Sequence, residues 1–253
     1  MNESVLSYLA ENERMLWQQY EWQIAHGQRK TLAPHTLSKL IAALREYPAE
    51  QLKQWVMAYC EQIFAPKAGI PNLTVPLPLF AEIIVPELKK GFDNGEARST
   101  LWIAVNFSHI REATKIEPAI RQHLNLDKLD FDDLYDMALN RDPDDKLIRQ
   151  ALIHYYLYSF DNCLHEIPQG VLATDWFCNH IQKLEVLLAA EGLLESYRDK
   201  LALWRFHCQS YTDYIANRND YLNYSDYLDK KGKDFEWRPW KYGRSFIVRS
   251  SGM

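Results

Sequence analysis

Apolar residues recur at helical spacing along most of the chain, and the longest such pattern lies in residues 142–228. We expect three consecutive helices there. In the last of them, steps of three and four positions separate the apolar residues Leu194, Tyr197, Leu201, Trp204, Cys208, Tyr211 and Ile215. Because a helix turns once in about 3.6 residues, this spacing predicts one continuous buried stripe. The sequence Asp-Pro-Asp-Asp at residues 142–145 predicts the start of the first helix, since a capping side chain, a proline and carboxylates all favour the positive helix end.

Shorter helical patterns precede residue 65. They predict an N-terminal three-helix unit in residues 1–65, with helices over residues 4–26, 36–47 and 49–64. Four prolines and one glycine then fall between residues 65 and 79. Because this density excludes a long helix, we expect residues 66–78 to form an extended, Pro-rich connector.

Residues 79–229 predict a body of helical hairpins. Before residue 142, the expected helices cover residues 79–92, 96–107, 117–124 and 131–140. Pro86 falls inside the first of these, which should be kinked at this residue or begin there. Helix–turn–helix pairs recur about every fifty residues, a spacing found in helical repeat proteins. We therefore predict an all-α fold of stacked antiparallel helix pairs, either an irregular bundle or a short α-solenoid, with a non-helical C-terminal tail.

The composition is that of a globular protein with a substantial core. The chain has 253 residues, of which 47% are hydrophobic, and no apolar run is long enough to cross a membrane. The first residues lack the basic and apolar segments of a secretory signal, so we expect a cytoplasmic protein without a membrane partner. The cysteines fall singly within helical patterns. We expect reduced core thiols, rather than disulfide or zinc frameworks, at Cys60, Cys163, Cys178 and Cys208.

Charge is distributed unevenly between the body and the tail. The formal net charge is −5, but residues 230–253 carry a net charge of +5, which leaves −10 for the remainder. Aromatic and basic residues alternate in this tail. The tail residues that we expect to contact a partner are Trp237, Arg238, Trp240, Lys241, Tyr242 and Arg244. Three interpretations are open: the tail closes the body as a hairpin or arm, binds a partner or a second copy of the chain, or binds nucleic acid, which the acidic body disfavours.

One motif carries candidate chemistry. Residues 132–136 read Asp-Asp-Leu-Tyr-Asp, which places three carboxylates within two turns of a helix, where they could hold Mg²⁺ and a diphosphate. This spacing resembles the aspartate-rich motif of terpenoid synthases and prenyltransferases, which are all-helical enzymes. The resemblance implies a second acidic metal-binding segment on a facing helix. Asp220 begins such a segment, but Asn223 and Tyr227 stand where that family has Ser or Thr and Glu.

Other motifs for catalysis are absent from the sequence. A GxSxG nucleophile turn, glycine-rich phosphate loops and HExxH do not occur. His154 and His165 share a helix face but should lie roughly 16 Å apart, too far to bind one metal ion. We therefore expect no enzymatic active site, no cofactor and no metal.

These observations favour a protein-binding module. We expect an acidic helical face to bind a basic macromolecular partner, as a bacterial immunity or adaptor protein does. The residues assigned to this face are Asp130, Asp132, Asp133, Asp136, Asp142, Asp144 and Asp145. Tyr221 and Tyr224 would add to the contact surface, unless this helix end packs against the body. Two alternatives stay open: a magnesium-dependent enzyme acting on a diphosphate, and a dimeric scaffold assembled through residues 230–253.

Overall fold

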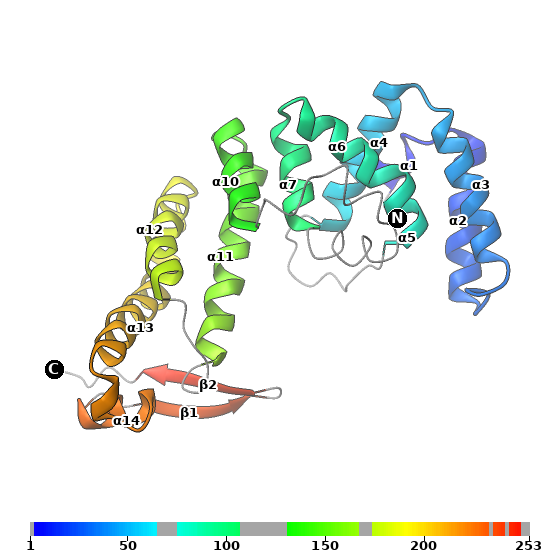
Figure 1. Cartoon of the computed structure of the whole chain (residues 1–253). Coiled ribbons are helices and arrows are strands. Elements are labelled where there is room, and N and C mark those ends of the chain that lie inside the picture. The colour runs from blue at the N-terminus through cyan, green and yellow to red at the C-terminus, as the bar shows by residue number, and fades with distance from the viewer. Residues whose placement is uncertain are drawn as a thin grey trace. The chain divides into compact units, whose positions relative to one another are not determined.

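The protein is all-α with a non-helical C-terminal tail, as its helical periodicity predicted (Figure 1). The computed structural model describes residues 3–64, 75–106, 131–166, 174–232, 235–240 and 243–248. The chain divides into two compact units, Met1–Arg149 and Gln150–Met253, and each unit has buried hydrophobic residues of its own. The helix expected over residues 117–124, and most of the predicted 66–78 connector, lie outside the described residues.

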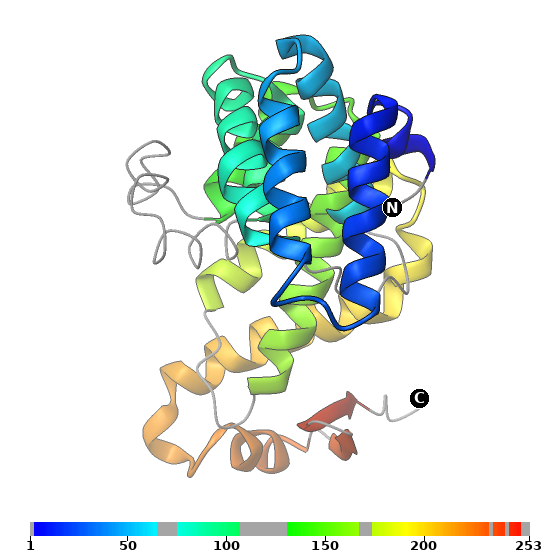
Figure 2. The same ribbon diagram turned by 90° about the vertical axis from the view of Figure 1, so that its right-hand side faces the viewer.

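The first unit is built from packed helices that follow one another along the chain. They are α1 (Glu3–Leu6), α2 (Glu11–Ala25), α3 (Ala33–Arg45), α4 (Ala49–Phe64), α5 (Leu77–Leu79), a π-helical turn (Phe80–Ile84), α6 (Val85–Asp93), α7 (Ala97–Val105), α10 (Phe131–Arg141) and the start of α11 (Lys146–Glu166). Figures 1 and 2 both show α2 and α3 side by side. Helix α7 contacts α4, α6 and α10. Trp55 and Trp102 are among the largest fully buried side chains.

The first helix expected from the sequence, over residues 4–26, is divided into α1 and α2. Between them, Ala10 has extended backbone angles and donates its N–H to the hydroxyl of Tyr47 at 2.8 Å. Because Tyr47 lies 37 residues further along the chain, the local pattern contained no signal for this break. Gly27 follows the end of α2 with a φ of 76°, where the sequence placed the helix end.

Pro86 lies in the first turn of α6, directly after the π-helical turn. The sequence left two possibilities for this residue, a kink or a helix start. In the structure, residues 77–93 form consecutive helical elements, and α-helical bonding resumes next to the proline. Proline has no N–H to donate to the carbonyl four residues earlier, which accounts for a change of hydrogen-bonding pattern here.

Gly91 sets the distance between α6 and α7. A Cβ atom at this position would lie 2.6 Å from Cβ of Ser99, which is fully buried, and 2.7 Å from a carboxylate oxygen of Glu96. The backbone carbonyl of Gly91 also accepts the N–H of Glu96 at 2.9 Å. Only glycine therefore permits this close approach of the two helices.

The second unit contains the rest of α11, followed by α12 (Thr174–Ala190), a 3₁₀ turn (Glu195–Tyr197), α13 (Arg198–Ala216), another 3₁₀ turn (Arg218–Asp220), α14 (Tyr224–Lys230), β1 (Phe235–Trp240) and β2 (Gly243–Val248). The two strands pair in antiparallel orientation. Aromatic rings form the core of the helical part. The ring centroid of Phe160 lies 4.8 Å from that of Phe177 and 5.1 Å from that of Trp204.

The apolar stripe predicted on the last long helix is buried only in its middle. Trp204 and Tyr211 are buried, whereas Leu194 and Ile215 are 42% and 45% exposed. The prediction of one continuous buried stripe was therefore wrong at both ends. A straight α-helix rotates slowly away from a repeat of 3.5 residues, and the buried face of α13 accordingly continues through Tyr214 rather than Ile215.

A disulfide between Cys178 and Cys208 joins α12 to α13, with the two Cα atoms 5.7 Å apart. Both residues are half-exposed. The expectation of reduced thiols is wrong for this pair, because the cysteines are 30 residues apart and only the packing of two helices brings them together. Cys60 is a buried free thiol, as expected, and burial raises the pKa of its thiol. The side chain of Cys163 lies outside the described residues.

Candidate functional site

The part of the predicted acidic face that the structure defines best is the turn between α10 and α11. We call residues 141–145 the acidic turn. Asp142 and Asp144 are exposed, whereas the side chain of Asp145 is only 8% exposed and points inward. Its carboxylate accepts Nε–H of Arg98 at 2.7 Å and the backbone N–H of Leu147 at 2.8 Å. Asp145 therefore caps α11 near the start that the sequence predicted, while its two neighbours stay at the surface.

Electrostatics keep the Asp145 carboxylate ionised. Burial alone would raise the pKa of Asp145, but the hydrogen bonds from Arg98 and from the backbone of Leu147 outweigh this and hold it below its usual range. The same contact raises the pKa of the Arg98 guanidinium. Both partners are thus stabilised in their charged forms.

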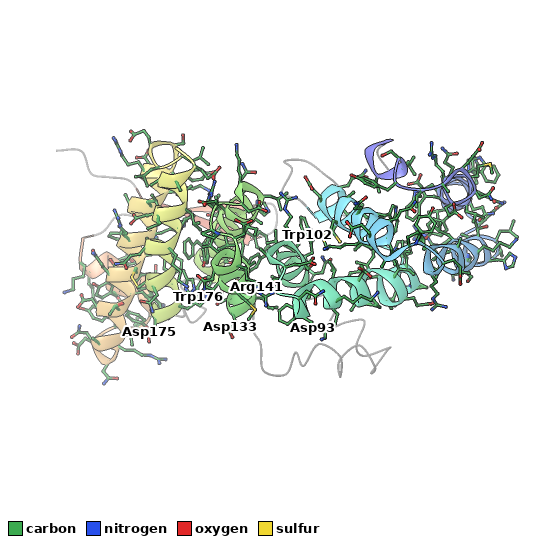
Figure 3. All side chains as sticks on the ribbon, turned by 90° about the horizontal axis from the view of Figure 1, so that it is seen from above. Asp93, Trp102, Asp133, Arg141, Asp175 and Trp176 are labelled. Atoms are coloured by element: carbon green, nitrogen blue, oxygen red, sulfur yellow. A yellow bond between two sulfur atoms is a disulfide. The ribbon has the colours of Figure 1, made fainter. Side chains whose placement is uncertain are left out.

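Arg141 fixes the first end of the acidic turn against the α6–α7 hairpin. Its guanidinium donates to the backbone carbonyl of Phe92 at 3.2 Å and to the hydroxyl of Thr100, and lies 4.9 Å from the centroid of the Phe92 ring. Figure 3 shows Arg141 on α10 and Trp102 on the neighbouring α7. The arginine is therefore directed into the unit, away from the exposed carboxylates of the turn.

Arg149 and Arg98 hold the other side of the acidic turn. Arg149 donates to the backbone carbonyl of Pro143 at 2.9 Å, and Arg98 pairs with the inward carboxylate of the turn. Within the described part of the chain, no ion pair includes Asp142 or Asp144. The nearby arginines thus bond to Pro143 and Asp145 and leave the carboxylates of Asp142 and Asp144 accessible.

The other predicted acids lie in the first half of α10, with Asp132 and Asp133 in its first turn and Asp136 at its middle. Asp133 is exposed, Asp132 and Asp136 are half-buried, and all three make interactions within the protein. Asp130 lies outside the described residues. The structure therefore spreads the predicted face along an 11-residue helix, with Asp132 roughly 15 Å and Asp136 roughly 9 Å from Asp142 along the helix axis.

The predicted tyrosine surface is a packed cluster at the contact of α13 and α14. Tyr224 is fully buried, with ring centroids of Tyr211, Tyr214 and Tyr227 at 5.0, 5.5 and 5.9 Å. Tyr221 is half-buried, with its ring centroid 5.0 Å from that of Tyr227. Tyr224 thus presents no surface to a partner. The same sequence pattern suited both a contact surface and this packing, and the structure has the packing.

The predicted tail contacts lie outside the part of the chain whose side chains are described. They are Trp237, Arg238, Trp240, Lys241, Tyr242 and Arg244. The scaffold that would assemble through residues 230–253 therefore stays a prediction.

The residues of the terpenoid-synthase-like motif can be placed individually. Asp133 in the first unit and Asp220 in the second are both exposed. Among the described residues, no group of three His, Cys, Asp or Glu side chains is arranged to hold a metal ion. The diphosphate enzyme also stays a prediction.

Sequence reasoning missed a cavity of about 710 Å³ in the first unit, which lies between α2, α3, the end of α4 and residues 75–78. Three aromatic rings line it, and the centroid of Trp17 lies 5.8 Å from that of Tyr20 and 5.9 Å from that of Tyr59. Its charged residues are Glu21 and Arg29. The only signal in the sequence is the pair of rings on one face of α2 with a cation shortly after the helix; the other walls come from distant segments.

Comparison with known proteins identifies no relative: no family model, no curated protein and no solved structure matches this chain. Within the described ranges, no helix has both the length and the apolar character needed to cross a membrane. A functional proposal must therefore be argued from the geometry of the acidic turn and the cavity.

Proposed function

We propose that the protein is a non-enzymatic binding module of the immunity or adaptor type, which binds a basic macromolecular partner through its acidic turn. One observation carries this proposal: Asp142 and Asp144 are exposed on a turn whose conformation is fixed by hydrogen bonds from three arginines, Arg98, Arg141 and Arg149. Lysines or arginines of a partner would meet carboxylates that already have a defined backbone position. Little conformational entropy is then lost when the complex forms.

The charge of the whole chain supports the same partner chemistry. Residues outside the tail carry a net charge of −10, which would attract a basic partner over longer distances and raise the rate of association. The cytoplasmic location belongs to this proposal. The disulfide between Cys178 and Cys208 argues against this location, since structural disulfides are rare in the reducing cytoplasm.

The proposal can be tested with two variants of equal charge. In the first, Asp142→Asn and Asp144→Asn neutralise the acidic turn. In the matched control, Glu11→Gln in the first turn of α2 and Glu46→Gln directly after α3 neutralise two exposed acids elsewhere in the same unit. Wild type and both variants are used to purify partners from the source cells at low and moderate salt, and a captured protein is then titrated in purified form.

The expected partner is a protein with a basic surface that wild type and control retain and the acidic-turn variant loses. We expect its affinity for the acidic-turn variant to fall roughly 10- to 100-fold, with a weaker dependence on salt, because two charge contacts are removed. Equal affinity for both variants, or no specific partner at either salt concentration, would contradict the proposal.

A further inference from the structure

The cavity of the first unit has the size and walls of a small-molecule site. At about 710 Å³ it lies within the range of roughly 300–1,000 Å³ found for ligand pockets. Besides the three rings, its walls are mainly aliphatic side chains and prolines, and these include Ile24, Leu37, Ile63 and Leu77. Such a lining favours a ligand with a flat or extended apolar body.

The aromatic walls are held in place by the core. Trp17 and Tyr59 are 5% and 2% exposed, and the ring of Tyr59 lies 5.2 Å from that of the fully buried Trp55. The indole N–H of Trp17 and the amide oxygen of Gln62 are buried and have no hydrogen-bond partner among the residues that the structure describes. Unsatisfied polar groups cost stability, so this wall is less well optimised for folding than a closed core would be.

Two hydrogen-bond donors stand at the polar side of the cavity. Arg29 is exposed and forms no ion pair with the described residues. Its positive charge lies close enough to Tyr20 to act on the pKa of the tyrosine hydroxyl. Burial raises the pKa of the Tyr20 hydroxyl even against the nearby arginine, so this hydroxyl remains a donor at neutral pH. A guanidinium and a phenol together suit an anionic oxygen.

The charges of the described lining favour a ligand with a single negative charge. Glu21 also belongs to the lining, and it makes an interaction within the protein. Arg29 is the one cation among the described lining residues, whereas a nucleotide or a phosphate ester carries two or more negative charges. A single carboxylate on an apolar body fits both the walls and the charges.

We propose that this cavity binds a small amphipathic monocarboxylate, with its apolar body among the rings of Trp17, Tyr20 and Tyr59 and its carboxylate at Arg29. This binding activity is separate from the proposed contact with a macromolecular partner. It requires neither the acidic turn nor the tail.

The test uses 2-naphthoate and its uncharged analogue 2-naphthalenemethanol, titrated into the full-length protein by calorimetry. We expect 2-naphthoate to bind with a Kd on the order of 0.1–1 mM, as befits so small a ligand. Arg29→Gln should weaken naphthoate roughly 5- to 10-fold and leave the alcohol unchanged, because only the anion interacts with the guanidinium.

Two tryptophan variants locate the site. Ser38→Trp places a large ring at an exposed position of the cavity lining and should abolish binding of both compounds. His35→Trp, at an exposed position of the same helix that does not line the cavity, should change neither affinity. Circular dichroism would verify that both variants are folded.

Three results would overturn the proposal. The first is that wild type binds no naphthoate at concentrations up to about 5 mM, which is well above the expected Kd. The second is that Arg29→Gln loses affinity for both compounds to the same extent, which would mean that the carboxylate is not recognised. The third is naphthoate binding that persists in a folded Ser38→Trp variant, which would place the site elsewhere.

Discussion

The two units of the molecule differ in the contacts that join the helices within each of them. In the first unit, charged side chains connect helices that are far apart in sequence: Lys53 donates to Glu96 at 2.6 Å, and Arg98 to Asp145 at 2.7 Å. In the second unit, an ion pair between Lys200 and Asp161 also joins two helices, but packed rings and a disulfide add to it. Directional bonds can fix the shape of a surface turn, whereas rings mainly fill volume. Both proposed binding sites lie in the first unit, the acidic turn held by polar bonds and the cavity walled by rings.

Among the variants proposed here, removal of the disulfide should have the largest effect on stability. The cross-link closes a loop of 30 residues, so we expect the Cys178→Ser, Cys208→Ser variant to lose about 3–4 kcal/mol of unfolding free energy. Hydrogen exchange should increase in α12 and α13 but not in α6 and α7, since the bond lies within the second unit.

The pairing itself can be checked in wild type. Alkylation under denaturing, non-reducing conditions followed by mass spectrometry should leave Cys178 and Cys208 unmodified and label Cys60. Labelling of Cys178 and Cys208 as well would remove covalent cross-linking from the comparison and leave the second unit dependent on non-covalent contacts.

Gly91→Ala should produce the next largest effect, this time in the first unit. The added methyl group would collide with the fully buried Ser99, and we expect a loss of about 2–3 kcal/mol with faster exchange in α6 and α7. A second change, Ser99→Gly, should restore part of the loss because it removes the Cβ atom that collides.

A matched glycine separates this collision from backbone effects. Gly95 has a φ of 79°, and a Cβ atom at this position would have no neighbouring atom within 4 Å, so Gly95→Ala should cost only about 1 kcal/mol. If the two glycine variants were equally destabilised, close helix approach would not be what Gly91 provides.

Most of the helices could be predicted because their apolar periodicity is a local property. The end of α2 was readable from Gly27, and the start of α11 was expected within residues 142–145 but lies at Lys146, where Asp145 rather than Asp142 is the cap. The break at Ala10 and the disulfide of Cys178 depend on partners tens of residues away. Tertiary contacts of this kind leave no trace in a pattern with a period of three to four residues.

The candidate sites differ in the same way. Exposed carboxylates at Asp142 and Asp144 follow from a polar helix junction, which the sequence shows directly. The inward position of Asp145 follows from Arg98, which lies 47 residues earlier. The cavity lined by Tyr20 forms only where α2, α3, α4 and residues 75–78 pack together, so no single stretch of sequence predicts it.

Arg141→Met tests how far one polar contact fixes the acidic turn. Methionine keeps much of the apolar packing against Phe92 but loses the bonds to its carbonyl and to the hydroxyl of Thr100, so we expect a loss of about 1–2 kcal/mol. Exchange should rise at the end of α10 and the start of α11. An unchanged rate there would mean that the arginine does not hold the turn.

The smallest expected effect is a dependence on pH that belongs to the first unit. The pKa of Asp145 is lower in the folded chain than in the unfolded chain, where it is about 3.9. Its contribution to stability is therefore present above about pH 4 and is lost as the pH falls through the folded-state pKa. Solvent screens the half-exposed Arg98, which limits this contribution to about 1 kcal/mol.

Asp145→Asn isolates this contribution, because asparagine can still cap α11 but carries no charge. Urea unfolding at pH 7, 5 and 3 should show the variant less stable than wild type at the two higher values, with the difference shrinking at pH 3. Asp144→Asn, at an exposed position without an ion pair among the described residues, should show a smaller difference at every pH. A constant difference between wild type and Asp145→Asn would assign the effect to capping geometry, and the charged contact with Arg98 would then not distinguish the first unit from the second.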